Sequence, residues 1–218
     1  MLRHPGNTKL HLHYEPTYEG LPLMHEKGPF IAEYLGTLKQ TIDLALSQYS
    51  RVLAFRVDLA FPRAVDLGLQ IQNNRALSRF KESFKAKLEH NRAQARRENP
   101  YAFDSKLRYV WAREFGQQEY PHYHLLCLLN GDAFYTPGRL ESSSPNMVSR
   151  MQEAWASALG VPLEVASPYV HISDNGTYRL RRYDQSEYCR LFHRASYLCK
   201  ANTKQFGDRC HGFGGSRG

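Results

Sequence analysis

The sequence predicts an α+β fold, in which a central antiparallel sheet of about five strands is backed by helices and preceded by an irregular N-terminal arm. Some segments alternate apolar and polar residues as strands do, whereas others repeat apolar residues every three or four positions as helices do. The two clearest strand-like segments are separated by only a short polar stretch, which favours antiparallel pairing. The chain has 218 residues, of which 42% are hydrophobic, so it can bury a core as one domain.

The ends of the chain differ from its middle. Residues 1–28 contain prolines and glycines without a sustained apolar period, which predicts the irregular arm. Residues 206–218 end in Gly-Phe-Gly-Gly-Ser-Arg-Gly, a stretch that loses much conformational entropy when it is ordered, so we expect a flexible tail. The folded domain is therefore predicted to span residues 29–205.

The first half of this domain predicts two helices around a strand. Residues 30–45 have the apolar spacing of a helix, and residues 51–61 alternate as a half-buried strand does. Residues 74–91 carry an apolar stripe on a surface otherwise rich in lysine and arginine. This second helix is thus expected to show a cationic side to solvent.

A hairpin and a helix are predicted next. Residues 107–115 and 122–129 are strand-like and are separated by Gly-Gln-Gln-Glu-Tyr-Pro, so we expect them to pair as an antiparallel hairpin. Ser144 and Pro145 are predicted to be the cap and first-turn proline of the following helix, which Gly160 ends.

The last part of the domain predicts a second hairpin and a final helix. Residues 169–173 and 177–183 flank Asp-Asn-Gly, a strong signal for a tight turn with positive φ. Asp184 and Glu187 have capping-box spacing and indicate a helix that runs to about Lys204.

The charge balance restricts the classes of partner. The chain has 29 Lys and Arg against 21 Asp and Glu, a formal charge of +8, which favours an anionic partner such as nucleic acid. The four cysteines lack CxxC spacing, so we expect reduced thiols and a cytoplasmic protein. We expect neither a signal peptide nor a membrane partner, because no apolar stretch approaches the length of about 18 residues that a span needs.

A candidate metal site begins with two histidines. His122 and His124 open an apolar strand two residues apart, so both imidazoles project from one face. A register that places Glu114 opposite His122 would add a carboxylate to that face. Two imidazoles and one carboxylate leave positions open for water and substrate, as catalytic metals require, and a phosphate oxygen would complete Mg²⁺ or Mn²⁺ there. Glu119 and Asp58 remain rivals of Glu114 as the third ligand.

A candidate nucleophile lies on the last predicted helix, where Tyr197 is off the apolar stripe. Its side of that helix is cationic and comprises Arg190, His193, Arg194, Lys200 and Lys204. Nearby positive charge favours a phenolate and can hold a phosphodiester in place for attack. We expect these cations to bind nucleic acid together with Arg181 from the preceding strand, and Lys200 to act with Tyr197.

The combination of Glu114, Pro-His-Tyr-His at 121–124 and Tyr197-x-x-Lys200 resembles the HUH single-strand endonucleases, in particular rolling-circle replication initiators of the inovirus and prophage type. The similarity spans roughly residues 51–204, and residues 54–61 resemble the family's hydrophobic first motif. It implies an HUH/RRM-like sheet and a phage, prophage or plasmid replication protein that nicks and rejoins single-stranded DNA at a replication origin, with host replication proteins as further partners.

The resemblance also assigns roles. It implies that His122, His124 and, less directly, Glu114 bind a divalent metal. Tyr197 would form a 5′-phosphotyrosine intermediate, with Lys200 near the scissile phosphate. No second tyrosine lies three or four residues from Tyr197 on its face, which implies a single-tyrosine enzyme or one that completes strand transfer with a second subunit.

Three other interpretations stay open at this stage. A two-histidine, one-carboxylate iron oxygenase would use the same ligands. A sheet-based nucleic-acid-binding module without catalysis would use the histidines and tyrosine to stack on bases. A zinc site at Cys199, Cys210 and His211 is a third idea, although its spacing matches no common zinc motif.

Overall fold

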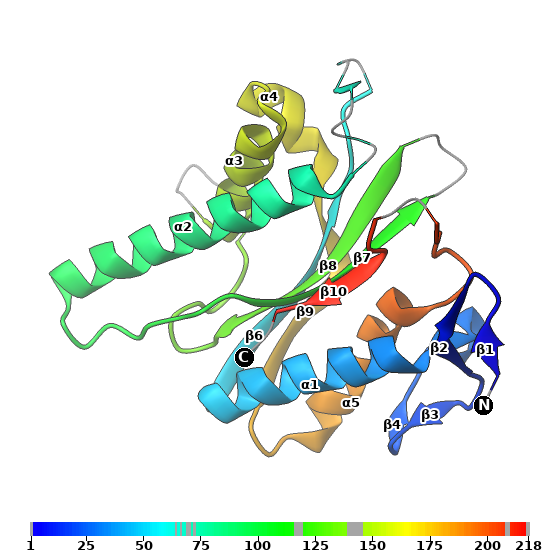
Figure 1. Ribbon diagram of the computed structural model, residues 1–218. Coiled ribbons are helices and arrows are strands. Elements are labelled where there is room, and N and C mark those ends of the chain that lie inside the picture. The colour runs from blue at the N-terminus through cyan, green and yellow to red at the C-terminus, as the bar shows by residue number, and fades with distance from the viewer. Residues whose placement is uncertain are drawn as a thin grey trace.

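A five-stranded antiparallel sheet forms the centre of the computed structural model, with strand order β10-β7-β8-β6-β9 (Figure 1). The structure describes residues 2–63, 65, 67, 68, 71, 73–115, 120–138, 146–207 and 210–216. The strands of this sheet are β6 (Arg51–Leu59), β7 (Arg108–Phe115), β8 (Pro121–Asn130), β9 (Val170–Arg181) and β10 (Phe213–Gly215). The predicted α+β class, a central antiparallel sheet backed by helices, is confirmed.

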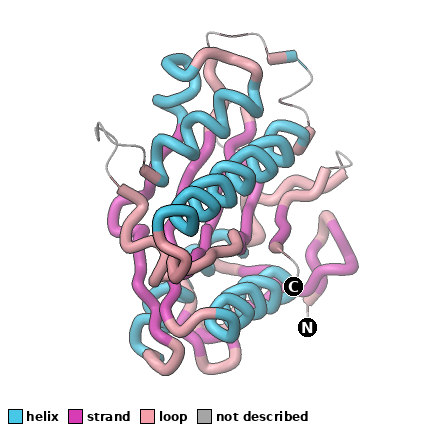
Figure 2. Tube along the Cα trace, turned by 90° about the vertical axis from the view of Figure 1, so that its left-hand side faces the viewer, coloured by secondary structure: helices cyan, strands magenta, loops and turns pink. Residues whose placement is uncertain are grey.

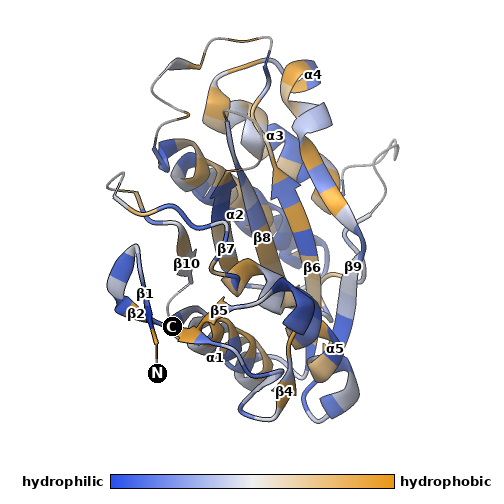
Figure 3. Ribbon diagram, turned by 90° about the vertical axis from the view of Figure 1, so that its right-hand side faces the viewer, coloured by the Kyte–Doolittle hydropathy of each residue, from blue (hydrophilic) through white to orange (hydrophobic). Residues whose placement is uncertain are grey.

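Helices cover both faces of this sheet. On one face lie α2 (Arg75–Glu98), α3 (Met147–Leu159) and the short α4 (Leu163–Ala166), which stand in front of the strands in Figure 2. On the other lie α1 (Ala32–Gln48) and α5 (Gln185–Ser196). Successive strand residues point to opposite faces, so β6 contributes Phe55 and Val57 to the α2/α3 core and Val52 and Ala54 to the α1/α5 core. Because both faces are covered, apolar residues occupy much of β6 and β8 (Figure 3).

The β7–β8 hairpin has the register that the metal hypothesis requires. Glu114 is opposite His122, and Ala112 is opposite His124. On the other side of β8, Asp58 of β6 is opposite His124. Three neighbouring strands thus bring their polar residues to one end of the sheet.

The predicted hairpin at Asp-Asn-Gly is wrong. Residues 170–181 form one strand, β9, which pairs with β6 on both sides of a bulge, because Phe55 is opposite Thr177 while Val57 is opposite Ile172. Four residues of β9 (173–176) therefore face the single residue Arg56. Asn175 does have the positive φ, 52°, that the sequence signalled. The signal marked a bulge inside a strand, where the same backbone conformation is also used.

The last helix ends earlier than predicted. Asp184 caps α5 by accepting a hydrogen bond from the Glu187 N–H, but α5 stops at Ser196, and Tyr197–Cys199 form one 3₁₀ turn, η4. Lys200 is already extended and bridges Phe30, at the start of the predicted domain. The chain leaves the helix because residues 29 and 30 offer it other backbone partners, among them the Pro29 carbonyl, which accepts from the Ala201 N–H.

Two helix boundaries in the middle of the chain also differ from expectation. The predicted cap at Ser144 and Pro145 lies outside the described residues, and α3 begins at Met147 with Asn146 as its cap. Gly160 ends that helix with φ 70°, as predicted. The second helix, α2, continues to Glu98, beyond the predicted end at about residue 91.

The two ends of the chain are more ordered than predicted. The arm contributes β1 (Arg3–His4) and β2 (Asn7–His13) to a three-stranded sheet, whose third strand, β5 (Phe30–Ile31), takes up the first residues of the predicted helix at 30–45. It also contains the hairpin of β3 (Thr17–Tyr18) and β4 (Leu21–Pro22), followed by the 3₁₀ turn η1 (His25–Lys27). At the other end, residues 213–215 are not a loose tail but form β10 against β7. Gly214 permits this, since a Cβ there would lie 2.8 Å from Trp111 Nε1.

The structure also bears on the thiols and on membrane insertion. Cys127, Cys189 and Cys199 are free thiols, and Cys127 and Cys199 are buried in the cores. No helix in the described ranges is both long and apolar enough to cross a membrane.

The bulge in β9 generates a stability prediction. A Cβ on Gly176 would lie 2.7 Å from the Ser173 carbonyl oxygen, so Gly176→Ala must shift backbone. We expect it to lower the free energy of unfolding by about 1–3 kcal/mol, the usual cost of overpacking. Gly212→Ala is the matched control, because its Cβ would meet neighbours at an ordinary 3.8 Å. Urea denaturation measures both, and equal stability of the two variants would contradict the account.

Candidate metal and tyrosine site

The polar residues of the site share the sheet face that α1 and α5 cover. Glu114 of β7, His122 and His124 of β8, and Arg56 and Asp58 of β6 all have the strand parity of the α1/α5 core residues on their own strands. They continue that face beyond its apolar part. The segment that follows α5 closes over them.

Glu114, His122 and His124 form a group that could hold a metal ion. One ligand atom from each residue lies within 4.8 Å of the others, and His124 Nε2 is 3.6 Å from Glu114 Oε2. Burial lowers the pKa of His122, which keeps its imidazole neutral and able to coordinate. Nitrogen and carboxylate donors at such spacing fit a divalent cation. The structure thus brings together the three ligands predicted from the sequence.

Asp58 orients His124 and is not itself part of the group that could hold a metal ion. Its Oδ1 lies 2.5 Å from His124 Nδ1, so the His124 ring is held with Nε2 turned toward Glu114. Burial raises the pKa of Asp58, but the hydrogen bond from His124 and the nearby positive charges, among them Arg56, together hold the pKa below its ordinary value. A carboxylate behind a histidine ligand is the usual support for a metal-binding imidazole. The other rival, Glu119, lies outside the described residues.

Glu114 is engaged by two lysines. Its Oε1 is 2.9 Å from Lys204 Nζ, and its Oε2 is 2.9 Å from Lys200 Nζ. Burial raises the pKa of Glu114, but the positive charge of Lys204 and the hydrogen bonds from both lysines hold it below its ordinary value. The Lys204 side chain is fully buried, so the prediction that it contacts nucleic acid is wrong. Its ammonium group instead balances the charge of Glu114.

Tyr197 lies against this group. Its ring meets the His124 ring edge-on with centroids 5.7 Å apart, and Lys200 Nζ is 3.5 Å from the Tyr197 ring centroid. Tyr197 is half-buried, so the phenol is within reach of solvent. The tyrosine, the lysine and the three ligands predicted from the sequence therefore form one cluster.

Arg56 is a residue of this cluster that the sequence analysis did not single out. Its guanidinium carbon is 5.3 Å from the Tyr197 ring centroid, and its side chain is only 6% exposed. One Nη lies 3.6 Å from Asp58, while Nε has no hydrogen-bond partner in the described part of the chain. The available signal was an arginine at an inward position of an otherwise apolar strand, since Arg56 follows Ala54 on the same face.

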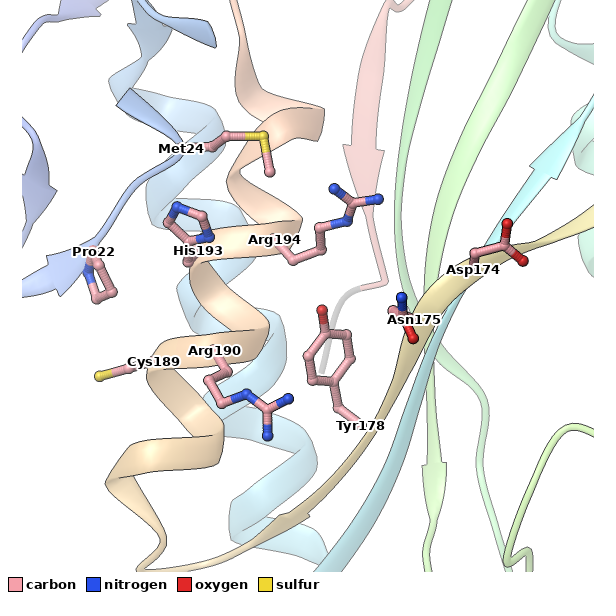
Figure 4. A pocket seen from close by; sticks show the side chains of 9 residues that line it. All are labelled: Pro22, Met24, Asp174, Asn175, Tyr178, Cys189, Arg190, His193 and Arg194. Carbon is pink, nitrogen blue, oxygen red and sulfur yellow. The ribbon is translucent and has the colours of Figure 1, made fainter. Parts of the chain in front are cut away.

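The predicted nucleic-acid contacts divide between two places. Arg190, His193 and Arg194 line a pocket of about 550 Å³, and both arginines extend from α5 toward the side of β9, which carries Tyr178 (Figure 4). Arg181 is not part of it, because Arg181 pairs with Arg51 at the opposite end of β6 from Asp58, about 20 Å away along the strand.

The cysteine-based zinc idea finds no support. Cys199, Cys210 and His211 are all described, and they do not form a metal group. The Glu114 group is the only candidate found within the described ranges.

Comparison with known proteins places the chain in a family. The model of the YagK/YfjJ C-terminal domain matches residues 13–216. The chain is 34% identical over 211 residues to the uncharacterized protein YfjJ of Escherichia coli (strain K12), covering 88% of this chain and 98% of the relative. It is 32% identical over 209 residues to the uncharacterized protein YagK of the same strain, covering 92% and 98%. No solved structure matches the chain. The chain belongs to the YagK/YfjJ C-terminal domain family.

The Glu114 ion pairs predict a pH-dependent contribution to stability. We expect Glu114→Gln to lower the free energy of unfolding at pH 7 by about 3 kcal/mol, because it leaves the buried Lys204 without a counter-charge. The pKa of Glu114 is depressed in the folded state, so the stability that Glu114 provides is present above its unfolded pKa of about 4.3 and is lost as pH falls through the folded pKa. The wild-type and variant curves should converge in acid.

Denaturant titrations between pH 7 and about pH 2, a range that spans the unfolded pKa and the depressed folded pKa, measure this difference. Glu26→Gln is the control, because Glu26 is exposed and should cost less than about 0.5 kcal/mol at any pH. A difference between Glu114→Gln and wild type that does not change with pH would contradict the assignment.

Lys200 generates a second prediction. Its ammonium group occupies Glu114 Oε2 and repels a cation at the three ligands. The Lys200→Met variant should therefore bind Mn²⁺ about tenfold more tightly than wild type. This gain corresponds to a modest fraction of the Coulomb repulsion between an ammonium group and a metal ion at such close range. Calorimetric titration with Mn²⁺ checks this, with the exposed Lys27→Met as the control. Weaker binding by Lys200→Met would show that Lys200 supports the ligands and does not compete with the cation.

Proposed function

We propose that this member of the YagK/YfjJ C-terminal domain family is a metal-dependent nuclease that nicks and rejoins single-stranded DNA through Tyr197, as its resemblance to the HUH single-strand endonucleases suggests. The observation that carries the proposal is the contact between the Tyr197 ring and the ring of the ligand His124. A phenol beside three metal ligands and two cations has the parts that phosphoryl transfer to a tyrosine needs.

The metal ligands fit the ion that this chemistry uses. Glu114, His122 and His124 would hold Mg²⁺ or Mn²⁺, and the bound ion would polarise a phosphate oxygen and offset the charge that develops on it. Asp58 keeps the ring of His124 in place for this role. A pocket beside Asp58, His122 and His124 gives access to this group.

Two cations flank the proposed nucleophile. Lys200 lies over the Tyr197 ring, and Arg56 stands 5.3 Å from the ring centroid. Both stabilise negative charge on the phenol oxygen and on the phosphate that it attacks. Arg56 is suited to binding the phosphate because its buried Nε has no hydrogen-bond partner among the described residues.

The proposed step is balanced within the DNA and the tyrosine. A bond forms between the Tyr197 oxygen and phosphorus as the bond from phosphorus to the 3′ oxygen breaks. The phenol loses one proton and the departing 3′ oxygen gains one, so no external oxidant, reductant or nucleotide is needed. The 3′ hydroxyl can prime synthesis, and its return to the phosphotyrosine reseals the strand. This chemistry suits the start of rolling-circle replication of a phage, prophage or plasmid.

The pocket at Arg190 and Arg194 supports a single strand as the substrate. It opens between α5 and β9, and its lining includes Arg194, whose charge acts on Arg56 beneath Tyr197. A row of cations from the pocket to the tyrosine would follow successive phosphates. Binding of DNA should therefore weaken as salt rises.

Tyr197→Phe tests the function directly. Incubation of the wild-type protein with Mn²⁺ and labelled single strands from its own replicon should give a protein–DNA adduct that survives denaturation. The adduct should be absent in Tyr197→Phe, which lacks the attacking oxygen, and unchanged in Tyr183→Phe, whose side chain is 93% exposed outside the site.

Two outcomes would overturn the nuclease assignment. Strand binding that ignores EDTA and yields no adduct or cleavage would favour a module without catalysis. Turnover supported by Fe²⁺ and a 2-oxo acid would identify an oxygenase.

A further inference from the structure

A second pocket, distinct from the one at Arg190, adjoins the metal ligands. It has a volume of about 250 Å³ and lies where the end of β6, the start of β8 and the 3₁₀ turn η3 (Ser167–Tyr169) meet. One side is formed by the centre itself, through Asp58, His122 and His124. The other side is aromatic and is formed by Phe61, Tyr120 and Tyr169.

The lining of this pocket combines flat apolar surface with charge. Tyr120 and Tyr169 line the pocket and are half-buried, whereas Phe61, which also lines it, is buried. Arg63 and His171 are exposed at the rim. Aromatic faces with the Arg63 cation and an imidazole at the edge suit a planar, polar and electron-rich ring joined to an anion, whereas a purely apolar ligand would make no use of these polar groups.

The walls are fixed before any ligand arrives. The Ala60 N–H donates to the Tyr169 carbonyl at 3.0 Å, and Trp155 Nε1 donates to the Ala60 carbonyl at 2.8 Å. These bonds join the end of β6 to η3 and to the core of α3. A preformed pocket loses little entropy when it binds, which favours a specific ligand over general surface adsorption.

The aromatic pocket adjoins the metal ligands, and the cationic pocket at Arg190, which has a different chemistry, lies near the same centre. The aromatic pocket is lined by Asp58, and the cationic pocket is lined by Arg194. The two are linked through Arg56, which lies 3.6 Å from Asp58 and feels the positive charge of Arg194. A strand that passes the metal ligands and Tyr197 would therefore meet aromatic rings on one side and arginines on the other.

We infer that the aromatic pocket holds one unstacked nucleobase, from the nucleotide whose phosphate lies at Glu114, His122 and His124. This inference rests on the proposed function, and it adds a site that selects and positions the nucleotide next to the cut. Tyr169 and Tyr120 stack on the base, and Arg63 and His171 lie near its edge or its sugar-phosphate. Stacking on an aromatic side chain strengthens binding of a base in a sequence-tolerant way.

Small ligands test the inference without knowledge of the origin sequence. The Mn²⁺-loaded protein is titrated in a calorimeter with each of the four deoxynucleoside 5′-monophosphates, with 2-deoxyribose 5-phosphate and with inorganic phosphate. We expect at least one nucleotide to bind about tenfold more tightly than deoxyribose phosphate, which carries the same anion without a base. Mn²⁺ should also broaden the NMR signals of the base protons of that nucleotide.

Variants of the pocket residues test whether the tighter binding of the nucleotide comes from this pocket. Tyr169→Ala should remove the tenfold preference and leave the affinity for deoxyribose phosphate unchanged, whereas Tyr169→Phe should keep the preference because the ring remains. Tyr101→Ala is the matched control, since Tyr101 is 90% exposed and does not line the pocket. Tyr120→Ala provides a second wall variant should Tyr169→Ala fail to fold.

The outcomes separate this inference from the proposed function. Equal affinity of wild type for nucleotides and for deoxyribose phosphate would overturn the base pocket and leave the nuclease proposal standing. A preference for the nucleotide that remains in both Tyr169→Ala and Tyr120→Ala would also overturn the base pocket and leave the nuclease proposal standing. Failure of the protein to bind Mn²⁺ or any of the phosphates would overturn both.

Discussion

The site depends on one buried carboxylate and the two lysines that neutralise it. Glu114 is only 2% exposed at the end of β7, where an unpaired negative charge would be costly. Lys200 and Lys204 reach it from the segment that follows α5. These ion pairs hold that segment against the sheet. The 3₁₀ turn that carries Tyr197 is consequently held over His124.

The same arrangement leaves the centre with surplus positive charge. Lys204 and Lys200 together exceed the charge of Glu114, and Arg56 shares Asp58 with His124. Arg194 also lowers the pKa of Arg56, after the larger effect of burial. Cations that repel one another this closely gain from an anion placed between them. The proposed phosphodiester substrate would supply that anion at Tyr197.

Sequence reasoning succeeded where contacts are local or follow from strand parity. The hairpin fixes the pairing of Glu114 with His122 within a few residues of its turn, so the ligand group could be predicted. The end of α5, the burial of Lys204 and the pairing of β10 could not be predicted, because each depends on segments distant in the chain, such as Pro29 for α5 and Trp111 for β10. The Asp-Asn-Gly signal reports a backbone conformation, and it cannot distinguish a hairpin turn from a bulge.

The bulge in β9 assigns sheet pairing and pocket lining to different residues of the same strand. Residues 170–172 and 177–181 hold the sheet through their pairing with β6, whereas residues 173–176 are released from that ladder. Asp174 and Asn175 stand on the lining of the cationic pocket and are exposed. Relatives can therefore exchange Asp174 without disturbing the framework, whereas the positive φ at Asn175 favours Asn, Asp or Gly there. The bulge is thus a place where recognition can diverge while the centre stays the same.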